Sequence, residues 1–138
     1  MHFTVLYLME GKKLDDVNTA LVEEEFGERF CDCCGESEPA IVDVCDWFQI
    51  GGRWDDQLKA KKGIKGDKSW SNADEESGEN WFSIVEIEDL IEPISKKFIY
   101  AVADEHDYFE DEEWKTKFIQ KINKKEIKGC VAVIDCHD

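Results

Sequence analysis

The chain has 138 residues, of which 42% are hydrophobic and 12% aromatic, which is enough to bury the core of one domain over residues 1–138. Its 33 acidic and 17 basic side chains give a formal net charge of −16. This charge argues against direct contact with nucleic acid or an anionic membrane and favours a basic protein as partner, with an acidic face kept for solubility as the alternative.

The chain begins with a predicted strand and a predicted helix. Residues 3–9 form an apolar run rich in β-favouring side chains, which predicts a first strand. Leu14, Val17 and Leu21 then recur at helical spacing, and the pattern continues to about Phe26. We expect this apolar face of the helix to lie in the core.

The middle of the chain is less regular. Residues 40–50 are rich in β-favouring side chains and predict a second strand. Residues 59–80 are polar, with lysines followed by acids, and predict a long surface loop. Residues 81–87 predict a short strand or a brace for the loop, and residues 88–94 predict one or two helical turns.

The last third of the chain again predicts strand, helix and strand. Residues 97–103 read as a third strand and residues 130–136 as the last strand. A second helix is expected at 111–123, because acids occupy its first turn and lysines its last. Its apolar stripe is expected to contain Trp114, Phe118 and Ile122.

This order of elements predicts a fold class. A β-α-β unit, a long loop between strands 2 and 3, and a second β-α-β unit most simply form an α+β domain with the ferredoxin-like βαββαβ order. In that fold the sheet is antiparallel and both helices cover one face. The first and last strands are antiparallel neighbours.

The expected pairing of the first and last strands brings three polar residues together. His2 begins the first strand, whereas Asp135 and His137 end the last one, two residues apart and on the same face. Cys136 between them must point to the other face. Histidine titrates near neutrality and a carboxylate can orient it, so the three could bind a metal or act as an acid/base set. Frayed terminal residues are the alternative.

A glycine pair between tryptophans marks a second candidate site. Gly51 and Gly52 can adopt positive φ or let the backbone approach another group closely. Arg53 offers a planar fork for a carboxylate or phosphate, and Trp47 and Trp54 offer stacking surfaces. The residues therefore suggest ligand recognition, or a glycine bulge whose tryptophans pack in the core.

The cysteines suggest a possible zinc site. Cys31, Cys33 and Cys34 form a knuckle with the C-x-x-C-G pattern, and Cys45 lies close enough in sequence to complete four thiolate ligands. A second C-x-x-C pair is missing, so free thiols on a loop are the alternative.

Acidic residues are concentrated between positions 104 and 113. This stretch contains seven carboxylates and no lysine or arginine. Paired carboxylates can serve hydrolysis, but such a dense cluster is more typical of a solvated face or a docking patch for a basic protein. The residues expected to contact such a partner are Asp104, Glu105, Asp107 and Glu110.

The compartment follows from what the sequence lacks. No segment reaches the ~18 apolar residues of a membrane span, and residues 1–4 lack the basic region and apolar run of a signal peptide. We expect a cytoplasmic protein with reduced cysteines.

Three segments together resemble a family of small proteins from bacteriophages and prophages. These are His2-Phe3-Thr4-Val5, Asp46-Trp47-Phe48 with Gly51-Gly52-Arg53-Trp54, and Val133-Ile134-Asp135-Cys136-His137; Trp114 to Phe118 also fits. The cysteine knuckle and the lysine-rich loop depart from that pattern, so a zinc site shared with the family is in doubt. The resemblance implies a phage or mobile-element origin and the host cytosol. It implies a common site formed by His2, Arg53, Trp54, Asp135 and His137, and it supplies no reaction.

Two functions follow as hypotheses. One is an acidic protein that binds and inhibits or modulates a basic host protein of the nucleic-acid-binding or defence machinery, in the manner of anti-CRISPR or DNA-mimic proteins. The other is a small-molecule or nucleotide binder, or a hydrolase, that uses the glycine-arginine-tryptophan motif with His2, Asp135 and His137. Motifs of the common enzyme classes are missing from the sequence, which favours the first.

Overall fold

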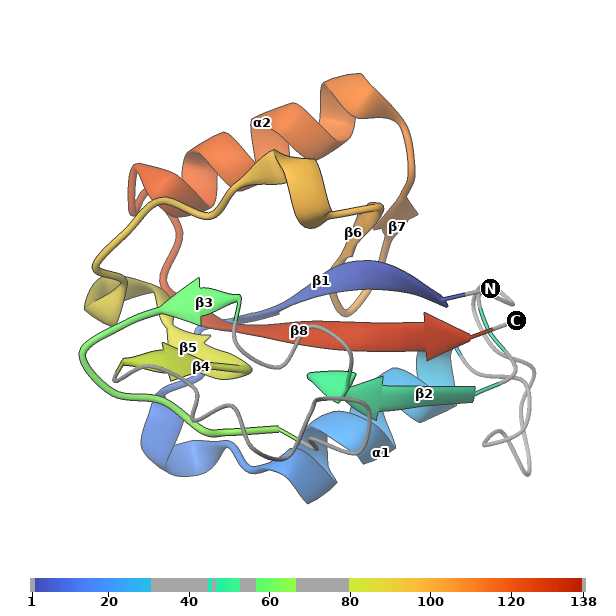
Figure 1. Cartoon of the computed structure of the whole chain (residues 1–138), viewed down its shortest axis with the longest axis horizontal. Coiled ribbons are helices and arrows are strands. Elements are labelled where there is room, and N and C mark those ends of the chain that lie inside the picture. The colour runs from blue at the N-terminus through green and yellow to red at the C-terminus, as the bar shows by residue number, and fades with distance from the viewer. Residues whose placement is uncertain (1, 31–44, 46, 53–56, 67–79, 138) are drawn as a thin grey trace, which may run out of the picture.

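The computed structural model describes residues 2–30, 45, 47–52, 57–66 and 80–137. In this part of the chain two α-helices flank a six-stranded mixed sheet (Figure 1). The strand order is β2-β8-β1-β6-β7, and β5 also pairs with β8. The strands of this sheet are β1 (His2–Glu10), β2 (Trp47–Ile50), β5 (Ile84–Glu86), β6 (Ala101–Ala103), β7 (Tyr108–Phe109) and β8 (Gly129–His137); the helices are α1 (Thr19–Phe30) and α2 (Glu112–Asn123).

The first and last strands form the centre of the sheet. β1 and β8 pair antiparallel along their full length, from His2 opposite His137 to Glu10 opposite Gly129. The two strands are apolar on both faces, because almost every side chain between these ends is buried. The predicted neighbourhood of the first and last strands is therefore confirmed, and it places both ends of the described chain together (Figure 1).

The ferredoxin-like arrangement differs from the observed one in two ways. First, β6 pairs with β1 in parallel, with Val5 opposite Ala101, so the sheet is mixed rather than antiparallel. Second, the helices pack against opposite faces of the sheet and not against one. Odd-numbered β1 residues such as Tyr7 share a core with α1, whereas Leu6 and Leu8 share a core with α2.

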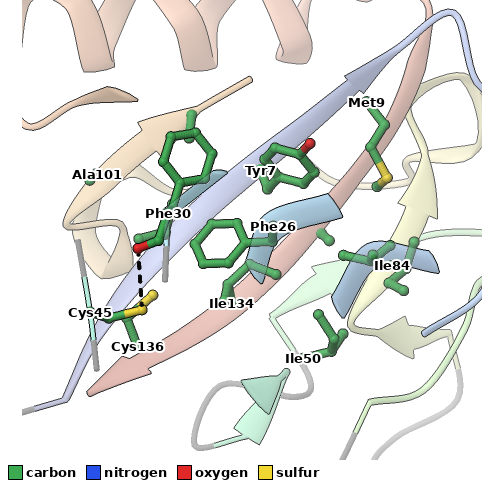
Figure 2. Packing of buried hydrophobic residues seen from close by; sticks show 14 of the residues in the cluster. Tyr7, Met9, Phe26, Phe30, Cys45, Ile50, Ile84, Ala101, Ile134 and Cys136 are labelled. Atoms are coloured by element: carbon green, nitrogen blue, oxygen red, sulfur yellow. Dashed lines mark hydrogen bonds between the residues drawn. The ribbon is translucent and has the colours of Figure 1, made fainter. Parts of the chain in front are cut away.

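The core on the α1 face is built around aromatic rings (Figure 2). Phe26 from α1 lies with its ring centroid 5.6 Å from Tyr7, 5.1 Å from Phe30 and 4.9 Å from Phe48. α1 begins later and ends later than predicted. It continues through Gly27 to Phe30, and the start of the predicted helix is a separate 3-10 turn at Leu14–Asp16.

The core on the α2 face confirms Ile122 and the partly buried Phe118 of the predicted stripe and corrects its third member, Trp114. The fully or nearly buried residues are Lys115, Ile119 and Ile122, whereas Trp114 is 53% exposed. The Nζ of Lys115 leaves the apolar face to donate to the carbonyl of Tyr100 at 3.2 Å and to pair with Glu112 at 2.8 Å. The aliphatic stem of a lysine therefore occupies the position that the tryptophan was expected to fill.

Several predicted boundaries also shift. β2 is confirmed over its last four residues, and positions 40–44 lie outside the described residues. The predicted loop at 59–80 begins in paired structure, because β3 (Leu58–Lys59) pairs with β4 (Trp81–Phe82). In the predicted third strand, residues 96–98 form a 3-10 turn and only Ala101–Ala103 are extended as β6. Positions 67–79 lie outside the described residues.

Burial of Cys130 on β8 predicts that the free energy of unfolding falls at alkaline pH. Its Sγ donates to the Lys12 carbonyl at 3.5 Å. Desolvation, followed by the carboxylates of Glu86, Asp89 and Asp16, raises its pKa from the ordinary 9.0 to about 12. The folded state thus holds this proton more tightly, so the stabilisation is complete below pH 9 and is lost as pH rises toward 12, at about 1.4 kcal/mol per pH unit.

This pH dependence can be measured by urea unfolding at about pH 7 and at about pH 10.5. We expect Cys130→Ala to lose less stability between these two values than the native chain does. An equal loss in the two proteins would contradict the assignment to Cys130.

Candidate functional site

One end of the α2 face is polar. β1, β8 and β2 run side by side there, with His137 opposite both His2 and Trp47, and Asp135 opposite both Thr4 and Gln49. Alternation along the strands puts all six side chains on the same face. We call this set the sheet-end cluster: His2, Thr4, Trp47, Gln49, Asp135 and His137. The predicted convergence of His2, Asp135 and His137 is confirmed, and Cys136 lies in the core of the other face as expected.

A carboxylate–imidazole pair forms the base of the cluster. Asp135 is fully buried, and its Oδ1 lies 2.9 Å from Nδ1 of His2, whose side chain is 12% exposed. A carboxylate at this distance favours the tautomer in which Nδ1 carries the hydrogen. Nε2 is then the ring nitrogen of His2 that carries the lone pair.

The ring of His2 is in mutual edge-to-face contact with two other rings, those of His137 and Trp47. The ring centroid of His137 lies 4.7 Å from His2 and 5.8 Å from Trp47, and His2 and Trp47 are 6.4 Å apart. Trp47 is 38% exposed and does not pack in the core. The cluster thus continues from a buried carboxylate to an indole at the surface.

The glycine pair closes the cluster from one side. Gly51 and Gly52 have φ values of +78° and +51°, and a Cβ on Gly52 would lie 2.5 Å from Oδ2 of Asp135. Both uses that the sequence suggested for these glycines, positive φ and close approach, are therefore confirmed. Arg53 and Trp54 follow directly in the chain and lie outside the described residues.

Thr4 and Gln49 belong to the cluster although the motif analysis did not select them. Thr4 is 1% exposed, and its Oγ1 has no hydrogen-bond partner within the described part of the chain. A buried hydroxyl without a partner is uncommon, because leaving it unpaired costs about 1–3 kcal/mol. The sequence contained the signal: Thr4 lies two positions after His2, and hence on the same strand face.

The structure describes only some of the residues that could bind a metal. Among the described residues no three histidine, cysteine or acidic side chains are placed to hold one ion. Cys31, Cys33 and Cys34 of the predicted zinc site lie outside those residues. The fourth, Cys45, is buried on the α1 face, where its Sγ donates to the Phe30 carbonyl at 3.9 Å (Figure 2). Zinc binding by the four cysteines remains a prediction.

Three of the four residues of the predicted acidic patch lie in the hairpin turn between β6 and β7, and Glu110 follows β7. Asp104 is partly buried, and its Oδ1 accepts from the backbone nitrogens of His106 and Asp107 at 2.8 Å, so this carboxylate shapes the turn. Asp107 is exposed at the tip and Glu105 is partly exposed. Glu110 accepts from the Tyr108 hydroxyl at 3.0 Å. The four residues are close in space, with different local roles.

The remaining acids of this stretch organise the start of α2. Asp111 caps the helix through a bond of 2.7 Å from the backbone nitrogen of Trp114. Hydrogen bonding to Lys115, with a smaller contribution from Lys96, lowers the pKa of Glu112 below its ordinary value. Glu113 pairs with Lys117 at 3.1 Å. The acidic turn and the first turn of α2 follow each other closely in the chain, and we call their exposed carboxylates the carboxylate-rich surface.

Comparison with family models, curated proteins and solved structures finds no match to the chain. Within the part of the chain that the structure describes, every helix is too short or too polar to cross a bilayer.

Proposed function

We propose that the sheet-end cluster binds a small polar ligand and that His2, oriented by Asp135, accepts a hydrogen bond or a proton from it. The observation that carries this proposal is the contact of 2.9 Å between His2 Nδ1 and a carboxylate that is fully buried. A carboxylate bonded to one ring nitrogen is one of the ways in which proteins fix the tautomer of a functional imidazole.

The energetics of Asp135 support a role beyond folding. Val131 and Val133 precede it on the same face of β8 and lie in the apolar core. Burying a carboxylate in such a sheet costs several kcal/mol before its partners compensate, and apolar replacements of buried pairs are often neutral or stabilising. A valine would have continued the strand without this cost.

The neighbours of His2 indicate how a ligand would be held. Trp47, which is 38% exposed, offers an indole for stacking, and the partly exposed His137 offers a second imidazole. The Thr4 hydroxyl adds a buried donor and acceptor next to Asp135. In this proposal Arg53 and Trp54 contribute an anion-binding fork and a second stacking surface, because they directly follow Gly52. A nucleotide has both of the groups that such residues recognise, a phosphate and an aromatic base.

The test is an NMR titration of histidine-labelled protein with inorganic phosphate, adenosine and AMP. We expect at least one of these probes to shift the ring signals of both His2 and His137. Asp135→Asn keeps the shape but removes the charge that orients His2, and should weaken this binding about tenfold or more. No shift with any probe, or an unchanged affinity in the asparagine variant, would refute the proposed role.

A second function is supported by a different surface. We propose that the carboxylate-rich surface formed by the β6–β7 turn and the first turn of α2 docks a basic protein. The net charge of −16 steers such a partner, and the exposed positions of Asp107 and Glu113 leave their carboxylates accessible. The test of this function is the affinity of the protein for a cationic peptide. We expect binding that weakens as salt is added.

The biological setting of the second function rests on the resemblance to phage and prophage proteins. In that setting the partner is a basic host protein in the cytoplasm, and the consequence of docking is inhibition or modulation of nucleic-acid-binding or defence machinery. The charge pattern supports a partner that itself binds nucleic acid, because its surface is basic for that purpose.

A further inference from the structure

Trp114 lies on the carboxylate-rich surface and contributes little to the core. It is 53% exposed on the first turn of α2, and its ring is stacked on Phe109 with centroids 5.3 Å apart and an interplanar angle of 15°. Phe109 lies on β7 and packs against the α2-face core, so it fixes the indole from behind. The result is a rigid aromatic surface held at the protein exterior.

A cation of the protein itself already occupies this surface. Nζ of Lys117 lies 5.5 Å from the centroid of the Trp114 ring and 3.1 Å from Oε1 of Glu113. An ammonium group held between an aromatic ring and a carboxylate receives both a cation–π and an ionic attraction. The positions of Trp114 and Glu113 are therefore suited to an organic cation.

We propose that Trp114 and Glu113 receive an arginine side chain of the basic partner, which displaces Lys117. This inference rests on the proposed docking function and names the residues and the partner group that carry it. The Glu113–Lys117 pair is exposed on both sides and hence weak, so its displacement is easy. A guanidinium is planar, stacks on indole and bonds a carboxylate through two parallel donors, so it fits better than the ammonium that it replaces.

The surroundings favour arginine over an anionic or purely apolar partner. Seven carboxylates lie between positions 104 and 113, and Glu110 and Asp111 directly precede the helix. They raise the local concentration of cations and repel anions. Exposed tryptophan and arginine are also the residues that most often dominate protein interfaces.

The experiment measures how tightly the full chain binds nona-arginine and nona-lysine peptides. Binding is measured by calorimetry and by the NMR shift of the indole N–H signal of Trp114. The structure supplies two matched controls. Phe98→Ala removes another half-exposed aromatic side chain, from the 3-10 turn at 96–98, and Lys128→Met removes one positive charge elsewhere. We expect Trp114→Ala to weaken nona-arginine binding about fivefold and Phe98→Ala to leave it unchanged. Lys117→Met should strengthen binding about threefold more than Lys128→Met does, because it also removes the competitor.

The outcomes separate this inference from the docking function. If nona-arginine does not bind the native protein, the docking function itself fails. If it binds, but Trp114→Ala and Phe98→Ala behave alike, or Lys117→Met equals Lys128→Met, only the arginine site is overturned. Equal affinity for nona-lysine and nona-arginine would likewise overturn it, because stacking of the guanidinium is what distinguishes the two peptides.

Discussion

Replacing Phe26 with alanine is expected to lower the free energy of unfolding by about 3–5 kcal/mol. The ring is fully buried and touches the rings of Tyr7, Phe30 and Phe48. Its removal loses apolar burial and leaves a cavity, because β1 and α1 are packed too closely to move and fill it. Urea unfolding followed by circular dichroism measures the loss.

The matched control is Trp114→Ala, which removes a larger aromatic side chain from a surface position. We expect it to cost about 1 kcal/mol or less, mostly from the stacking on Phe109. Equal losses for Phe26→Ala and Trp114→Ala would show that the indole packs as part of the core, as the helical spacing alone had suggested. This control also establishes that Trp114→Ala is folded for the binding experiment.

Replacing Gly52 with alanine is expected to destabilise the protein by about 3 kcal/mol, the sum of two costs. The first is the φ of +51°, which disfavours any side chain. The second is the collision of the new Cβ with Asp135, whose own Cβ would be 2.6 Å away on the central strand β8 and cannot withdraw. The contact between Asp135 and His2 should be disturbed as well.

Gly11→Ala separates these two costs. Gly11 has φ of +77°, but a Cβ there meets nothing within 4 Å, so only the backbone cost of about 1 kcal/mol is expected. Thermal or urea unfolding of the two variants gives the difference. If Gly52→Ala costs no more than Gly11→Ala, the close approach of the glycine to Asp135 is not a constraint on the site.

The candidate site could be predicted from the sequence only where the pairing of the strands could be predicted. Once the first and last strands are antiparallel neighbours, the period of two places His2, Asp135 and His137 on one face and Cys136 on the other. The register that achieves this is fixed by nine consecutive residue pairs. Thr4 follows from the same period, two positions after His2, whereas Gln49 could not be found as a motif, because its role comes from the pairing of β2 with β8.

The arrangement of the helices was predicted wrongly for an identifiable reason. Order of elements alone suggested both helices on one face, but β1 and β8 are apolar at successive positions as well as at alternate ones, as Val5-Leu6-Tyr7-Leu8 shows. Such runs are typical of strands covered on both faces. The parallel pairing of β6 with β1 fits the same pattern, because parallel strands are usually covered on both faces of the sheet.

The surface of α2 shows where periodicity misleads. Trp114, Phe118 and Ile122 fit helical spacing, yet Lys115, Ile119 and Ile122 fit it equally well once the lysine is treated as an aliphatic stem with a charged end. Hydrophobicity scales favour the stripe with Trp114, because they assign lysine to the surface. The carbonyl of Tyr100, which receives the lysine, is fixed only by the tertiary structure.

The pairing of β1 with β8 also sets the timing of folding during synthesis. β1 ends at Glu10 and β8 begins at Gly129, so β1 must wait for roughly 120 further residues before its longest-paired neighbour exists. At about 5–20 residues per second this wait lasts on the order of ten seconds. Throughout it, a nine-residue strand that is apolar on both faces remains without its main partner on the ribosome. The apolar side chains of β1 therefore cannot be covered by β8 until translation has passed residue 137.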